Sequence, residues 1–294
     1  PNMPWDGTEV WCGQFDDAGT VTFPRRVAGG TEESICTPDW SPGGNIVFIS
    51  DRSGWWNVYE YDGRSDRALL KMEAEFSGPQ WGLDAESVKF TSEHKMLCSY
   101  LAMGATHVVE LDLLSGEWRR VEVPFDRVSM TQYEGGKLAL SGASQTSLGS
   151  IALLDMATGE VETIKKSSEV NLDQGYISIP ETIEFPTTGG KRAYAFYYPP
   201  TNQEMEADRA ERPPLIAMVH GGPTSEASST LSLETQFWTS RGFAVVDINY
   251  GGSSGYGREY RRRLNGQWGV VDVDDAEAAA RFLIEEGRVD GERL

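Results

Sequence analysis

One short pattern recurs through the first half of the chain, and the spacing of its copies restricts the fold. Each copy has an alternating strand pattern, an Asp, a Gly-containing turn and a second strand pattern. The Asp residues are Asp16, Asp62, Asp112 and Asp155, at intervals of 46, 50 and 43 residues. A period of about 40–50 residues with about four strands per repeat is typical of β-propeller blades, because a single blade cannot bury both of its faces alone.

A second motif supports the same period. The sequence Pro-x-Trp ends at Trp40 and returns 41 residues later at Trp81, each time ahead of a predicted strand. Together the two motifs predict about four blades in residues 1–169, the first of them incomplete. Because known propellers have four to eight blades, we expect part of a larger ring rather than a closed ring of four.

The pattern changes from residue 170 onward. Residues 181–186 and 192–198 alternate in polarity, which predicts an antiparallel pair of strands. Residues 214–219 and 243–248 are almost continuously apolar, which is typical of strands buried on both faces.

Two helices are predicted among these strands. A short amphipathic helix carries Leu233, Phe237 and Trp238 and ends at Gly242. A longer helix spans residues 272–287, and its apolar positions are Val273, Ala276, Ala280 and Leu283. Strands that alternate with helices predict a parallel sheet with helices on its faces.

Two glycine-rich loops follow the apolar strands. His220-Gly221-Gly222-Pro223 comes after the first strand, and residues 249–257 come after the second. In such sheets the chemistry lies at the carboxyl ends of the strands. Two successive glycines allow backbone N–H groups to point into a cleft, as an oxyanion hole requires, although a tight strand-to-helix turn would use the same residues.

The sequences VHGGP at residues 219–223, NYGGSSGYG at 249–257 and QWG at 267–269 closely resemble the catalytic domain of the prolyl oligopeptidase family. The nearest likeness is to its acylaminoacyl-peptidase and aminopeptidase-like branch. The Pro-x-Trp motif and residues 50–54 resemble the propeller blades that precede that domain. The resemblance covers essentially the whole chain.

This resemblance implies a serine peptidase or amidase that cleaves short peptides or aminoacyl amides through an acyl-enzyme. A propeller would gate access to an α/β-hydrolase domain, whose N-terminal part is residues 170–294. It implies that the Gly222 backbone N–H forms half of the oxyanion hole and that His220, Gly221 and Tyr256 bind substrate. The nucleophile elbow and the Asp and His of the triad would come after Leu294, so we expect residues 1–294 alone to be inactive.

Ser253 is the one serine that fits a Gly-x-Ser-x-Gly pattern. A nucleophile elbow passes directly into a helix, whereas Gly-Tyr-Gly follows here and favours a loop. No His follows Ser253, and the last one, His220, is 33 residues earlier. We therefore expect Ser253 to be a loop residue.

Composition excludes several other classes. The net charge of −19 repels phosphate backbones and anionic lipids, so neither nucleic acid nor membrane is an expected partner. The short basic cluster, Arg258 with Arg261, Arg262 and Arg263, is expected to be a solvated helix face. No phosphate-binding glycine loop or metal-ligand cluster is present, so no cofactor is expected.

Three widely spaced cysteines, Cys12, Cys36 and Cys98, fit neither a disulfide framework nor a zinc site and favour a reducing compartment. The chain has no apolar stretch long enough to span a bilayer, and its first residues lack a signal-peptide pattern. We therefore expect a cytoplasmic location.

Other conspicuous residues have ordinary structural explanations. We expect Glu32 and Glu33 to be solvated, His94 to lie in an exposed turn, His107 to lie in a strand, and Trp55 and Trp56 to pack between blades. Two alternatives to the peptidase remain open at this point. One is a carboxylesterase-like hydrolase, which uses the same oxyanion chemistry, and the other is a propeller that serves as a non-catalytic binding or scaffold module.

Overall fold

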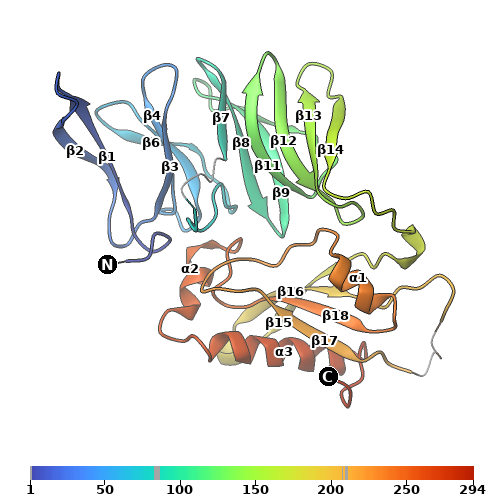
Figure 1. Cartoon of the computed structure of the whole chain (residues 1–294). Helices are drawn as coiled ribbons and strands as arrows, with labels where there is room; N and C mark the ends of the chain where they lie inside the picture. Colours follow the sequence, from blue (N-terminus) through green and yellow to red (C-terminus); the bar gives the residue numbers. More distant parts are fainter. Residues whose placement is uncertain (1, 83–86, 207, 209–210) are drawn as a thin grey trace.

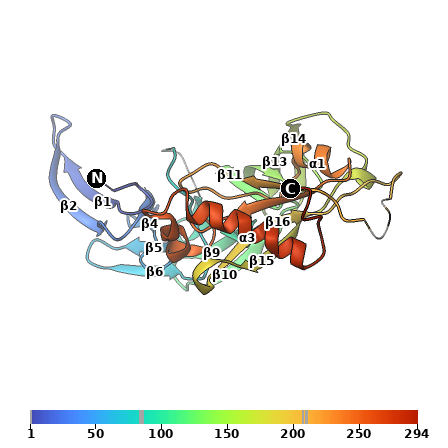
Figure 2. The ribbon, with the colours of Figure 1, turned by 90° about the horizontal axis from the view of Figure 1, so that it is seen from below.

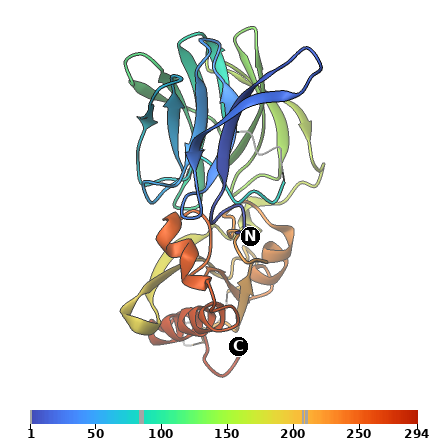
Figure 3. The same ribbon diagram turned by 90° about the vertical axis from the view of Figure 1, so that its left-hand side faces the viewer.

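The computed structural model describes residues 2–82, 87–206, 208 and 211–294. A row of antiparallel sheets lies on one side, and a single sheet with helices lies on the other (Figure 1). The row of sheets is stacked on the single sheet. The N-terminus lies where the two parts meet, and the C-terminus lies in the second part (Figure 3).

The first part consists, within the described residues, of one two-stranded and three four-stranded antiparallel sheets. This confirms the predicted blades, including the incomplete first one. The strands are β1 (Glu9–Phe15), β2 (Val21–Gly29), β3 (Ile35–Trp40), β4 (Ile46–Ser50), β5 (Asn57–Tyr61), β6 (Asp66–Leu70), β7 (Val88–Ser92), β8 (Lys95–Ala102), β9 (Ala105–Asp112), β10 (Trp118–Val121), β11 (Arg127–Glu134), β12 (Lys137–Ala143), β13 (Ser150–Asp155) and β14 (Val161–Lys166).

The recurring Asp residues hold the hairpin turns. The Oδ1 atom of Asp62 accepts hydrogen bonds from the backbone N–H groups of Arg64 and Ser65, each at 2.8 Å. The Oδ1 atoms of Asp112 and Asp155 accept corresponding bonds from the residues two and three positions later. The pKa values of all three carboxyls are lowered, mainly by these backbone bonds. The repeat visible in the sequence is therefore the signature of one repeated turn.

Side chains between neighbouring blades form the core of this part. Trp56 is fully buried in a cluster that joins β4 and β5 to Met96 of β8 and Val109 of β9. A second cluster joins Leu97 of β8 to Leu138 of β12. The prediction that Trp56 packs between blades is confirmed.

The second part is a four-stranded sheet in the order β15-β16-β18-β17. Its strands are β15 (Glu181–Pro186), β16 (Arg192–Tyr198), β17 (Leu215–Val219) and β18 (Ala244–Asn249). The β15–β16 pair is antiparallel, as predicted, and β17 pairs with β18 in parallel. In the described part of the chain, three short 3-10 helices lie outside the sheet, at Gln174–Tyr176, Thr188–Gly190 and Arg262–Leu264.

The helices are α1 (Leu233–Thr239), α2 (Gly257–Arg261) and α3 (Val271–Glu285). Viewed from below, α3 crosses the underside of the sheet (Figure 2). Phe196, Tyr198 and Val245 form a separate cluster on the other face, where Trp238 of α1 packs against them.

Three predictions about these elements were wrong. The strand β17 is not buried on both faces: Ala217 and Val219 are exposed because β17 is the end strand of the sheet. Leu233 and Phe237 of α1 are also exposed, while the polar side of that helix is buried. In α3 the predicted positions Ala276, Ala280 and Leu283 do pack into the core, but Val273 is 49% exposed, and the polar residue Asp275 is buried on the same helix.

Candidate active site

The loop after β17 presents two free backbone donors. Gly221 and Gly222 are both exposed, and within the described part of the chain no acceptor bonds to either backbone N–H. A side chain at Gly222 would place its Cβ 2.7 Å from Tyr250 Oη and 3.1 Å from the Trp268 ring. The close approach of these two side chains is therefore a reason for glycine at this position, and it leaves the N–H available to an oxyanion.

The loop after β18 braces the Gly222 loop. The Tyr250 ring stacks on the His220 imidazole at 4.4 Å, and Tyr250 Oη donates to the His220 carbonyl at 3.3 Å. The backbone N–H of Ser254 donates to the Ser225 carbonyl at 2.8 Å. The two loops that the sequence predicted at the carboxyl ends of the strands are thus in direct contact.

The structure brings together His220 and Ser253, which are 33 residues apart in the sequence. His220 Nε2 lies 2.6 Å from Ser253 Oγ. Ser253 is a loop residue, as predicted, but the sequence argument considered only histidines after Ser253 and so missed this contact, and the short helix α2 does begin soon after it. Ser253 is nevertheless completely buried, so a substrate carbonyl cannot reach its hydroxyl. The pair has the contact of a Ser–His dyad without the access that a nucleophile needs.

The predicted substrate-binding residues His220 and Tyr256 make different kinds of contact. His220 holds the loop through the contacts just described, and burial lowers the pKa of its imidazole. The Tyr256 ring stacks on Tyr194 at 4.5 Å, and its hydroxyl accepts a hydrogen bond from Asn249 Nδ2 at 3.1 Å. In this arrangement Tyr256 packs within the hydrolase part, and burial raises the pKa of its phenol.

The propeller contacts this site from above. Trp81 Nε1 donates to the Thr224 carbonyl at 2.8 Å, and Arg127 Nη2 forms an ion pair with Glu226 Oε1 at 2.5 Å. A cavity of about 160 Å³ lies between the two parts, lined by Arg127 and Glu226 together with residues such as Tyr100 and Ser254. Neither His220 nor Gly222 lines this cavity, but Ser254, whose N–H bonds to the Ser225 carbonyl, connects it to the two loops of the site.

Two of the four arginines in the basic cluster are not solvated, contrary to expectation, whereas Arg262 is exposed as predicted. Arg258 and Arg261 are buried at the junction of the two parts. Both guanidinium groups bond to Asp51 Oδ2, at 2.6 Å from Arg261 Nη2, and Arg261 Nη1 lies 3.7 Å from Glu75 Oε1. The Arg261 guanidinium also lies 3.9 Å from the centre of the Trp56 ring. Two arginines of α2 and two carboxyl groups of the propeller thus form one buried cluster.

Glu75 makes the stability of this cluster dependent on pH. Burial raises the pKa of Glu75 from 4.5 to about 7, although Arg261 and the N–H groups of Trp56 and Gly257 oppose the shift and Asp51 adds to it. Between these values the folded chain holds a proton that the unfolded chain has released. The contribution of Glu75 to the free energy of unfolding therefore decreases as pH rises from about 4.5 to about 7.

We expect denaturant titrations at several pH values to show this decrease in the wild-type chain. A Glu75→Gln variant should show a shallower decrease over the same range, because its side chain does not titrate. Parallel pH profiles for the two proteins would contradict the assignment.

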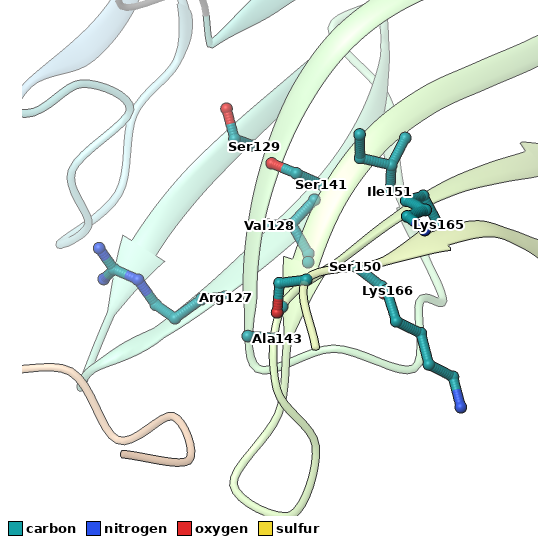
Figure 4. A pocket seen from close by; sticks show the side chains of 12 residues that line it. Arg127, Val128, Ser129, Ser141, Ala143, Ser150, Ile151, Lys165 and Lys166 are labelled. Carbon is teal, nitrogen blue, oxygen red and sulfur yellow. The ribbon is translucent and has the colours of Figure 1, made fainter. Parts of the chain in front are cut away.

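A larger cavity, of about 480 Å³, lies elsewhere. It is on the outer face of the last blade, between Val128, Ile151 and Lys165 (Figure 4). Neither His220 nor Gly222 lines it, and its apolar floor belongs to the exposed face of β13 and its neighbours. We therefore do not connect it with the Gly222 site.

The remaining candidates are mostly structural. Glu32 is exposed as expected, but Glu33 is not simply solvated, because its Oε1 accepts hydrogen bonds from Ser50 Oγ and Arg52 Nε. His94 lies in an exposed turn and His107 in β9, as predicted. In the described residues no group of three or more His, Cys, Asp or Glu is placed to hold a metal ion, and no helix is long and apolar enough to cross a membrane.

Comparisons with known proteins bear on this geometry. Residues 229–294 match the sequence profile of the prolyl oligopeptidase family. The whole chain superposes on a puromycin-hydrolyzing peptidase of Mycobacterium tuberculosis with a TM-score of 0.95 and 38% identity, covering 46% of that chain. The chain is thus similar to the prolyl oligopeptidase family in sequence over residues 229–294, and to this peptidase in fold over its whole length.

Curated proteins match this chain over shorter stretches. An uncharacterized peptidase of Bacillus subtilis is 35% identical over 40% of this chain, and the match covers 18% of that protein. The acylamino-acid-releasing enzyme of Arabidopsis thaliana is 25% identical over 68% of this chain and matches over 29% of its own length. The chain thus spans less than half the length of these proteins.

Proposed function

We propose that this chain forms part of a serine peptidase or amidase that cleaves short peptides or aminoacyl amides through an acyl-enzyme. The observation that carries the proposal is the exposed, unbonded N–H of Gly222 at the carboxyl end of β17. Such a donor can stabilise the negative charge that develops on a carbonyl oxygen during acyl transfer. His220 and Gly221 would shape the same subsite.

The similar proteins support the choice of substrate. A solved relative is described as a puromycin-hydrolyzing peptidase, and a curated one as an acylamino-acid-releasing enzyme. Both names describe attack on an acyl or aminoacyl bond. In our proposal the propeller, residues 1–169, limits access to the hydrolase part, residues 170–294, as the cavity beside Arg127 and Glu226 would allow.

The nucleophile, in this proposal, lies outside residues 1–294. The described serine nearest to a histidine, Ser253, is buried, and the chain covers only 46% of its structural relative. A triad acting on a carbonyl at Gly222 would then come from the portion of the protein that this chain does not contain. We further propose a reducing, cytoplasmic location, which fits three cysteines that are all unpaired.

Labelling with a fluorophosphonate probe tests the proposal. We expect the longest protein encoded by the native gene to be labelled and to hydrolyse an aminoacyl p-nitroanilide, because its nucleophile is activated. The 294-residue chain alone should take no label. Intact mass spectrometry of both proteins provides the readout.

Two outcomes would contradict the proposal. A longest gene product that takes no label would favour a non-catalytic propeller module. Labelling of the 294-residue chain itself would make Ser253 the first candidate for the nucleophile, and the unlabelled Ser253→Ala variant would then identify it.

A further inference from the structure

His220 and Ser253 form a hydrogen-bonded pair whose polarity can be worked out from their partners. His220 Nδ1 lies 2.8 Å from the Gly221 carbonyl oxygen, which can only accept. The proton of the neutral imidazole is therefore on Nδ1, and Nε2 is an acceptor. It follows that the Ser253 hydroxyl donates to Nε2 across the 2.6 Å contact.

Ser253 is itself held rigidly. It is completely buried, and its backbone N–H donates to the Tyr250 carbonyl at 2.9 Å. The preceding glycine, Gly252, has a φ of +132° and packs so closely on Leu264 that a Cβ there would lie 2.8 Å from the Leu264 Cβ. One residue earlier, the N–H of Gly251 donates to the buried carboxylate of Asp275 at 2.7 Å.

His220 connects the fixed Ser253 side chain to the glycine loop. Its Nδ1–H bonds to the carbonyl of Gly221, and that carbonyl belongs to the peptide unit that carries the Gly222 N–H. Because a peptide unit is planar, fixing its C=O also fixes the direction of its N–H. The chain of contacts therefore runs from Ser253 through His220 to the orientation of the candidate oxyanion donor.

We infer that Ser253 and His220 are positioning residues that aim the Gly222 N–H, and that Ser253 is not a nucleophile. The inference rests on the proposed function, since it assigns Gly222 to the oxyanion hole. The buried Ser253 hydroxyl holds the His220 imidazole in place, and the imidazole holds the peptide unit between Gly221 and Gly222. An oxyanion donor misaligned by a fraction of an ångström loses much of its effect on the transition state.

The kinetic test uses four variants of the longest gene product, assayed with an aminoacyl p-nitroanilide. Ser253→Ala removes the donor to Nε2. His220→Asn can keep the bond to Gly221 but cannot reach Ser253, whereas His220→Gln can reach Ser253 but loses the bond to Gly221. Ser178→Ala is the matched control, because Ser178 is also completely buried and its hydroxyl donates to the Pro199 carbonyl at 2.6 Å.

We expect Ser253→Ala and both His220 variants to lower kcat by about tenfold to a hundredfold, with KM changed by less than about threefold. Their affinity for a peptide boronic acid, which places a negative oxygen in the oxyanion hole, should fall by a similar factor. Ser178→Ala should retain the wild-type kcat even though it also loses a buried hydrogen bond. A Ser253→Ala enzyme with a wild-type kcat would overturn the inference, as would a His220→Gln or His220→Asn enzyme with one.

A second measurement separates this inference from the proposed function. In the 294-residue chain, the imidazole ¹⁵N shifts of His220 should report a proton on Nδ1. Ser253→Ala should raise the pKa of His220, because the lost hydrogen bond stabilised the neutral ring. If the longest gene product hydrolyses nothing, the proposed function fails. If the ¹⁵N shifts and the pKa of His220 are unaffected by Ser253→Ala, the hydrogen bond between Ser253 and His220 is overturned, and the inference fails with it.

Discussion

Replacing Asp51 with Asn should lower the free energy of unfolding by about 3–5 kcal/mol, the usual cost of breaking a buried ion pair. Asp51 Oδ1 accepts the Ser34 N–H at 2.7 Å, and its Oδ2 accepts from both Arg258 and Arg261. Whichever way an Asn amide is turned, its NH₂ group faces another donor. Among the described residues, Glu75 is then the one carboxyl group of the cluster left beside the two guanidinium groups, and its raised pKa of about 7 keeps it protonated at lower pH.

Denaturant unfolding followed by tryptophan fluorescence measures this loss, since Trp56 lies beneath Arg261. The control is Glu32→Gln, which breaks an ion pair between the same two parts of the chain. That pair, Glu32 with Arg262, is 2.7 Å long but exposed, and exposed pairs contribute at most about 1 kcal/mol. Equal losses in the two variants would mean that the buried cluster does not hold the propeller to α2.

Removing the Asp275 side chain should cost about 2–4 kcal/mol. This carboxylate in α3 accepts one hydrogen bond from the Gly251 N–H at 2.7 Å and another from the Thr187 hydroxyl. Asp275→Ala leaves both donors in a buried site without their partner. The start of the loop that braces His220 would lose its attachment to α3.

The conservative variant Asp275→Asn should lose much less stability. Its amide oxygen can accept from Gly251, and its NH₂ group can donate to the Thr187 oxygen. Thermal unfolding of both variants provides the comparison. If Asp275→Asn were as unstable as Asp275→Ala, the carboxylate charge rather than the two hydrogen bonds would be the stabilising feature.

Local patterns in the sequence predicted the blades and the two glycine loops well. The turn aspartates at 62, 112 and 155 act within three residues of themselves, so their role is visible in the sequence. The same is true of β15, whose alternation follows from one buried face, whereas its partner β16 is buried on both faces. Strand alternation and turn hydrogen bonds depend on residues close together in the sequence, so the sequence alone predicts them.

Long-range partners were the source of the errors. Arg258 looks like part of a surface charge cluster until Asp51, 207 residues earlier, is placed against it. Ser253 and His220 are separated by 33 residues, and only the parallel pairing of β17 with β18 brings their loops together. The exposure of β17 was missed because an apolar run gives no information about whether its strand is at the centre or the end of a sheet.

The open side of β17 has a geometric consequence for the chemistry. Within the described sheet β17 pairs only with β18, and on its outer side the Leu215 N–H already donates to the Arg293 carbonyl at 2.9 Å, which leaves the backbone groups of Ala217 and Val219 open to one more strand. A strand that pairs with β17 in parallel would have its carboxyl end beside His220 and Gly222. A side chain at that end would approach a bound carbonyl carbon while its oxygen points at the Gly222 N–H. In the proposed acyl transfer, the position of the β17 edge would therefore determine where such a strand brings an attacking group.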